Sequence, residues 1–66
     1  MDKKIIGERL RTIRGSRTRA DVAEGCGVSK SSITMYELGN RVPSDQVKLK
    51  LAAYLKFSIE EVFFTE

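Results

Sequence analysis

The amino-acid sequence predicts an all-α fold, a compact domain of five short helices. Apolar residues recur at helical spacing along most of the chain, and a serine or threonine that can cap a helix stands before four of these segments. No segment shows the alternation of apolar and polar residues expected for a half-buried strand. At 66 residues the chain has room for one small domain, which we expect to cover residues 1–66.

The first helix is expected over Lys3 to Arg14. Ile6, Leu10 and Ile13 recur there at helical spacing and share one face. The Gly-Ser-Arg run at residues 15–17 interrupts this pattern and ends the helix. The apolar face of this helix is the first part of the predicted core.

The second helix is expected from about Thr18 to Gly25. Thr18 and Asp21, three residues apart, resemble a capping box, and the aspartate also suits the positive end of the helix. The inward residues are Val22, Ala23 and Cys26. Cys26 stands among apolar residues, so a buried thiol is favoured over a redox sensor, which would need exposure and a lowered pKa.

A tight turn and a third helix follow. Gly27 can adopt a positive φ at no steric cost, and Ser29 is a good N-cap for the next helix. That helix is expected to end near Leu38, because Gly39 and Asn40 form a left-handed stop.

Two further helices complete the predicted fold. Ser44 caps the fourth helix, whose buried stripe consists of Val47, Leu51, Ala52 and Leu55. Phe57 is expected to close the end of the core. Ser58 and Glu61 form an S-x-x-E capping box that opens a last short helix through Phe64.

The positive charge of the chain is unevenly distributed. The net charge is +3, but residues 1–41 hold nine Lys and Arg against five Asp and Glu, a balance of +4, whereas residues 42–66 have a balance of −1. This asymmetry suits a domain that presents a basic surface to a polyanion. A solvated basic face is the simpler alternative.

The composition also limits where the protein acts. The N-terminal stretch MDKKIIGERLR has no apolar run longer than two residues, so neither a membrane anchor nor a signal peptide is expected. The single cysteine cannot form an internal disulfide, which agrees with a reducing compartment. We therefore expect a cytoplasmic protein.

The third helix has two different faces. At about 100° per residue, one arc holds Ser29, Ile33, Tyr36 and Glu37. The opposite arc holds Lys30, Ser31, Thr34, Met35 and Leu38. The first arc is large and mostly apolar and is expected to face the core. The second has short hydroxyls, one cation and one thioether.

The second arc is unusual for a surface that faces water alone. Serine and threonine have poorer helix propensity than Glu, Lys, Gln or Arg, so another requirement is expected to select them. In the major groove of DNA, lysine donates to guanine, hydroxyls reach donors or acceptors, and methyl groups contact thymine. The arc is therefore interpreted as a surface that reads DNA, and an ordinary polar surface is the alternative.

The block GVSKSSITMYELGNRVPS resembles the pattern of XRE-like helix-turn-helix regulators of the phage-repressor and Cro type. The positions that fit the family pattern are Val22, Ala23, Gly27, Val28, Ile33 and Tyr36. The resemblance covers nearly the whole chain. It implies a lambda-repressor-like fold with the helix-turn-helix at about residues 18–38 and the third helix as the recognition helix in the major groove.

The resemblance also implies which residues contact DNA. They are Arg19, Ser29, Lys30, Ser31, Thr34, Met35, Asn40 and Arg41. Lys30, Ser31, Thr34 and Met35 match positions that read bases, and the others match contacts to the DNA backbone. Arg14 and Glu37 match an internal ion pair, so Glu37 is assigned to the fold. With one long polar side chain in the first turn, base readout is expected to be sparse and DNA shape to add to specificity.

These observations predict a sequence-specific regulator, a repressor that binds double-stranded DNA as a homodimer on a palindromic operator. Phe64 lies about 140° from Ile59 around the last helix, which makes it a candidate dimer contact. An enzyme is not expected, because the chain has no histidine, no glycine-rich phosphate loop and no metal-ligand cluster. No cofactor or small-molecule ligand is indicated. A protein-interaction module similar to an antirepressor remains the alternative.

Overall fold

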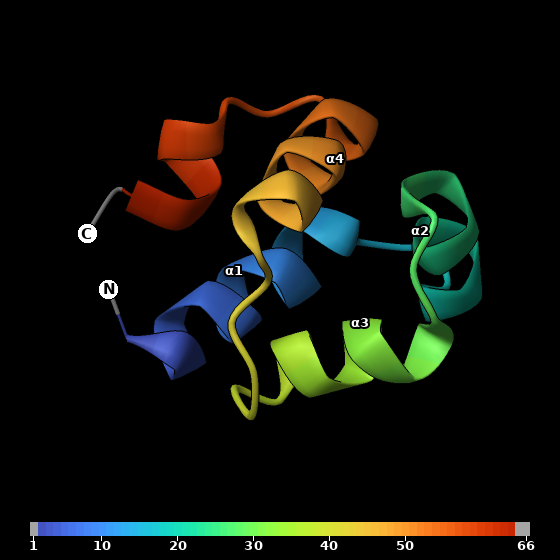
Figure 1. Ribbon diagram of the computed structural model, residues 1–66, viewed down its shortest axis with the longest axis horizontal. Coiled ribbons are helices and arrows are strands. Elements are labelled where there is room, and N and C mark those ends of the chain that lie inside the picture. The colour runs from blue at the N-terminus through green and yellow to red at the C-terminus, as the bar shows by residue number, and fades with distance from the viewer. Residues whose placement is uncertain (1, 65–66) are drawn as a thin grey trace.

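The computed structural model describes residues 2–64, which form four α-helices and a short π-helical segment (Figure 1). In chain order these are α1 (Lys3–Arg14), α2 (Arg19–Cys26), α3 (Lys30–Glu37), α4 (Asp45–Leu55) and η1 (Glu60–Phe64). No strand occurs between residues 2 and 64. The predicted all-α fold of five helices is therefore confirmed.

A side-chain cap precedes each of the four α-helices. Asp2 Oδ1 accepts from the Lys4 N–H at 2.7 Å, and Ser44 Oγ accepts from the Val47 N–H at 3.3 Å. Thr18 and Ser29 cap α2 and α3 in the same way. Because Thr18 is the cap, the predicted start of α2 was one residue early, and α2 continues one residue further, to Cys26.

The predicted capping box before the last helix is formed. The Glu61 N–H donates to Ser58 Oγ at 3.1 Å, and the Ser58 N–H donates to Glu61 Oε1 at 3.0 Å. The bond from the Ser58 backbone and the Ser58 hydroxyl together hold the pKa of the Glu61 carboxyl below its ordinary value.

All five elements contribute to one hydrophobic core. Its buried members are Ile6, Leu10, Val22, Ala23, Cys26, Ile33, Tyr36, Leu51, Leu55, Val62 and Phe63. Phe63, Leu51 and Val62 are the largest side chains that are fully buried. Cys26 is buried as expected, and this burial raises the pKa of its thiol, so the residue lacks the features of a redox sensor.

The prediction that Phe57 closes the core was wrong, because its side chain is 42% exposed. Lys56 ends α4 in a left-handed conformation with φ of 63°, and the Phe57 N–H then donates to the Ala52 carbonyl at 3.1 Å. The left-handed turn at Lys56 and this hydrogen bond hold Phe57 at the surface, beside the end of α4. Phe63, from the next element, is 1% exposed and fills the core instead.

Glycines allow α1 to approach the end of α3 closely. A Cβ atom on Gly7 would lie 2.5 Å from the Glu37 carbonyl oxygen and 2.6 Å from that of Tyr36. Gly39 stops α3 with φ of 76°, as predicted, and a Cβ there would lie 3.1 Å from Cα of Lys4. The C-terminal end of α3 is therefore seated against the backbone of α1.

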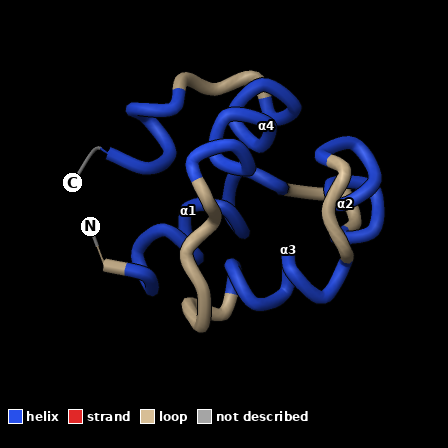
Figure 2. Tube along the Cα trace, in the orientation of Figure 1, coloured by secondary structure: helices blue, strands red, loops and turns tan. Residues whose placement is uncertain are grey.

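The helices leave one side of α3 uncovered. In Figure 1, α3 lies along the lower edge of the molecule, with α1 and α2 above it and α4 further away. A three-residue turn, residues 27–29, joins α2 to α3, and a longer loop leads from α3 to α4 (Figure 2). Within the described chain, no helix is long and apolar enough to cross a membrane.

Candidate nucleic-acid interface

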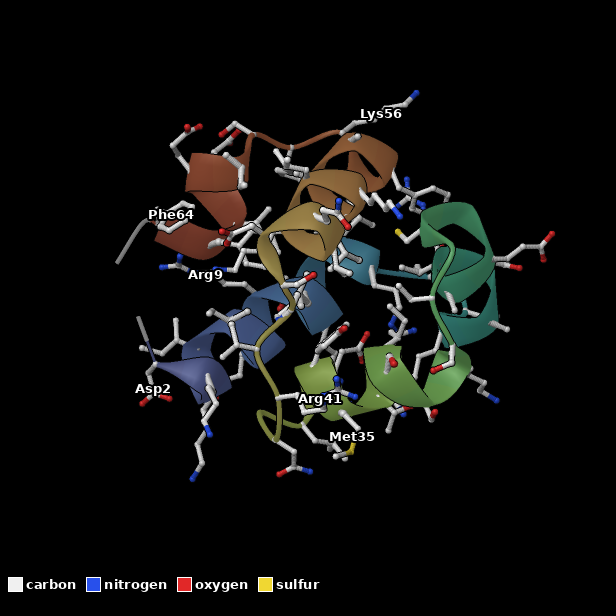
Figure 3. All side chains as sticks on the ribbon, viewed as in Figure 1. Asp2, Arg9, Met35, Arg41, Lys56 and Phe64 are labelled. Carbon is white, nitrogen blue, oxygen red and sulfur yellow. The ribbon has the colours of Figure 1, made fainter. Side chains whose placement is uncertain are left out.

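The outer face of α3 presents small polar groups to solvent. Lys30 and Ser31 are exposed, whereas Thr34 and Met35 are half-buried. Leu38, at the end of the same face, is 59% exposed. Figure 3 shows Met35 and Arg41 together on the lower edge of the molecule, the side of α3 that no other helix of residues 2–64 covers. The predicted division of α3 into two faces is found in the structure.

Three serine hydroxyls gather at the first turn of α3. Ser29 Oγ accepts from the Ser32 N–H at 3.1 Å and caps the helix. It also lies 3.2 Å from Ser31 Oγ and 2.9 Å from Ser32 Oγ. Although the helical wheel placed Ser29 on the inner arc, the residue stands before the helix and is exposed. The N-terminus of α3 therefore offers hydroxyls and helix-end N–H groups, which suit an anion such as phosphate.

Two other side chains on this surface are oriented by local bonds. Thr34 Oγ1 donates to the Lys30 carbonyl at 3.2 Å, so toward a partner Thr34 offers an acceptor and its methyl group. Asn40 Nδ2 lies 4.0 Å from Met35 Sδ in a weak donor contact. Asn40 and Arg41 are both exposed in the loop that follows α3.

The inner face of α3 ends in a buried carboxylate. The Glu37 side chain is 2% exposed, and Arg14 binds it through two bonds, from Nε to Oε2 at 2.7 Å and from Nη2 to Oε1 at 3.2 Å. The fork of the guanidinium matches the two carboxylate oxygens. Arg14 Nη1 also donates to the Arg17 carbonyl at 2.7 Å, so the same side chain holds the loop between α1 and α2.

A second arginine binds the same carboxylate. Arg19 Nε donates to Glu37 Oε1 at 3.1 Å, and the Arg19 side chain is 32% exposed. The family resemblance implied that Arg19 contacts the DNA backbone at a position that also braces the recognition helix, and it left open whether an arginine braces that helix. It did not indicate Glu37 as the partner of Arg19. The two residues are 18 positions apart on different helices, and no spacing rule connects them.

The candidate dimer contact lies on a different side from the outer face of α3. Phe64 is 60% exposed, and Figure 3 shows it at the upper left, well away from Met35. Lys48 Nζ lies 5.2 Å from the centre of its ring, so part of the ring is covered by a cation. Ile5 and Phe57 are each 42% exposed and line an open groove of about 440 Å³ between α1 and the C-terminal segment.

The fold and this surface define a helix-turn-helix regulator. Two short helices are joined by a three-residue turn, and the second helix packs one face on the core while its other face stays open. The family model for the helix-turn-helix domain matches residues 5–62. The chain therefore belongs to the helix-turn-helix family and is a DNA-binding regulator.

Among solved structures, the chain is similar to the restriction-modification controller protein C.AhdI from Aeromonas hydrophila. The two chains are 31% identical, with a TM-score of 0.87, over 94% of this chain and 97% of the controller protein. Comparison with curated protein sequences gives no match. The resemblance to XRE-like regulators noted in the sequence is thus confirmed at the level of the helix-turn-helix domain.

Proposed function

We propose that this protein is a sequence-specific transcription regulator, a repressor, that inserts α3 into the major groove of an operator as a homodimer. The observation that carries this proposal is the composition of the uncovered face of α3, where Lys30, Ser31 and Thr34 present donors, acceptors and a methyl group. The inner face of the same helix is packed, so these groups stand on a rigid support.

The residues of this surface are assigned to two kinds of DNA contact, to bases and to the backbone. Lys30 is the long, exposed donor and is assigned to guanine, whereas Met35 and the methyl of Thr34 are assigned to thymine methyl groups. Ser29, Asn40 and Arg41 flank the helix at its two ends and are assigned to the DNA backbone.

A dimer provides the affinity that a single short recognition helix lacks. In regulators of this fold, two recognition helices enter successive major grooves, and the half-sites lie about 10 bp apart. The exposed apolar side chains Ile5, Phe57 and Phe64, all outside the outer face of α3, support a contact between two copies that leaves both DNA-reading faces open.

Repression follows from binding alone. A dimer seated on a promoter excludes other proteins from that stretch of DNA and needs no catalytic site, and we assign no enzymatic activity to this chain. The likeness to a restriction-modification controller protein supports a regulatory role. The same proposal includes a cytoplasmic location, where the operator is accessible.

The alternative is a module that keeps the fold and binds only proteins, and salt dependence distinguishes the two. Affinity for a labelled duplex of mixed sequence is measured by fluorescence anisotropy at salt concentrations from about 50 to about 300 mM, a range that includes physiological ionic strength. With Arg19 and Arg41 of both subunits on phosphates, log K falls linearly with log salt with a slope of about −3.6. A slope near zero contradicts DNA binding.

A further inference from the structure

The first turn of α1 has charges of the wrong sign for the start of a helix. Lys3 and Lys4 are its first two residues, and no acidic residue stands in this turn. The N-terminus of a helix has a positive partial charge, so cations there lower helix stability. Within residues 2–64, neither of the two ammonium groups forms an ion pair. The turn therefore presents two cations at a position where local stability disfavours them, so another requirement is expected to select them.

Lys4 lies against the end of the helix that is assigned to reading bases. A Cβ atom on Gly39 would be 3.1 Å from both Cα and Cγ of Lys4, so the stem of this side chain runs alongside the glycine that stops α3. The next two residues, Asn40 and Arg41, are exposed and are assigned to the DNA backbone. Figure 3 shows Asp2, directly before α1, on the same lower side of the molecule as Arg41. Lys4 therefore continues the surface formed by the loop after α3.

We propose that Lys4 binds a phosphate of the DNA backbone, next to the phosphates bound by the loop after α3. A DNA phosphate supplies the negative charge that the first turn of α1 lacks. The ammonium group is a point charge on a flexible stem, so it can bind a phosphate without a fixed geometry. The proposal rests on the proposed function and extends the DNA interface beyond the helix-turn-helix to α1. It adds two phosphate contacts to each dimer.

A phosphate is favoured over a base edge because of where Lys4 lies along α3. Lys30 precedes Leu38 by eight residues, which corresponds to about 12 Å along the helix axis. The N-terminal residues of a recognition helix contact base edges, whereas Lys4 lies beside the other end of α3. Lys4 should therefore add affinity and salt dependence, but no preference for sequence.

The test compares K4Q and K4E with two matched controls, K56Q and K56E. Lys56 is also exposed, and Figure 3 shows it at the upper edge of the molecule, opposite Arg41. The molecule measures 27 × 23 × 22 Å, and charges are screened over about 8 Å at an ionic strength of about 0.15 M, so Lys56 should not affect DNA bound at α3. Binding of each full-length variant to a selected operator and to an unrelated duplex is measured over a salt series. Urea denaturation gives the midpoint of unfolding.

The proposal predicts that K4Q weakens binding to both duplexes by the same factor, roughly fivefold for two exposed ion pairs per dimer. With Lys4 included, the salt slope of wild type is about −5.4 in place of the −3.6 expected from Arg19 and Arg41 alone, and K4Q reduces its magnitude by about 1.8. K4E weakens binding further, whereas both Lys56 variants stay within about twofold of wild type. Because an acidic residue suits the start of a helix, the denaturation midpoint of K4E should equal or exceed that of wild type.

The proposal is overturned if K4Q keeps the affinity and salt slope of wild type. It is also overturned if the Lys56 variants lose as much affinity as the Lys4 variants, since net charge alone would then explain the loss. A midpoint of K4E below that of wild type would assign Lys4 to the fold, and a changed operator preference of K4Q would assign it to a base. If wild type shows no salt-dependent binding to either duplex, the proposed function fails instead, so the two failures are distinguishable.

Discussion

The inner and outer faces of α3 differ in how their polar groups are bonded. On the inner face, Glu37 is bonded to arginines from α1 and α2, while Ile33 and Tyr36 are buried at 3% and 5% exposure. On the outer face, the hydroxyls of Ser31 and Thr34 bond only within their own turn of the helix. One helix of eight residues thus holds a fixed support and an open surface, and substitutions on each face should affect different properties.

The largest effect is expected on the inner face. The substitution Glu37→Ala removes the carboxylate that two arginines share and leaves the charge of partly buried Arg14 without an ion-pair partner. We expect a loss of about 3–5 kcal/mol in the free energy of unfolding, measured by urea denaturation. As a control, Glu24→Ala on the exposed side of α2 should change stability by less than about 0.5 kcal/mol. A loss below about 1 kcal/mol for Glu37→Ala would show that the bonded carboxylate of the inner face does not stabilise the fold more than a surface residue does.

The next effect is expected on the outer face, in DNA preference and not in stability. Lys30→Ala removes the long exposed donor from the first turn of α3. Discrimination at one base pair of each half-site should fall by about 1–3 kcal/mol, measured by competition with single-substituted operators. The control Lys50→Ala, at an exposed position of α4, should keep the wild-type preference. Equal weakening on every competitor would assign Lys30 to phosphate instead.

A smaller and more uniform effect is expected at the loop beyond α3. Arg41→Ala removes one exposed cation that is assigned to the DNA backbone. All sequences should bind more weakly, and the salt slope should decrease in magnitude by about 0.9 per site. Titrations of operator and unrelated duplex at several salt concentrations measure both quantities. A changed order of preference among operators would mean that Arg41 reads bases.

The smallest effect is expected far from α3, at the capping box of η1. The pKa of Glu61 is lowered in the folded protein, so its bonds with Ser58 stabilise the fold above the ordinary pKa of 4.5 and are lost as pH falls through the lower folded value. At pH 7 the denaturation midpoint of wild type should be higher than that of Glu61→Gln. At acid pH the two midpoints should become equal. A difference in midpoint that stays constant from pH 7 to acid pH would contradict this assignment.

Much of the fold was predictable because its signals are local. Ser29, Ser44 and Ser58 mark helix starts by hydrogen bonds that span only three residues, and all three caps are present. The inner face of α3 was likewise predictable, because helical period alone brings Ile33, Tyr36 and Glu37 together.

The remaining features depend on tertiary distances that a single sequence does not specify. The bond from Arg19 to Glu37 joins the start of α2 to the end of α3 and depends on how these two helices pack against each other. Phe57 was misplaced for a similar reason. Its apolarity indicated burial, but the turn at Lys56 and the competing side chain of Phe63 leave it at the surface.

Selection of bound sites from a random duplex pool tests most directly whether the outer face of α3 reads DNA. Wild type should enrich one palindromic site with half-sites about 10 bp apart. Lys30→Ala should change the enriched base at one position of each half-site, and Arg41→Ala should leave the sequence unchanged. Recovery of no enriched site, or of the same site with Lys30→Ala, would contradict the account.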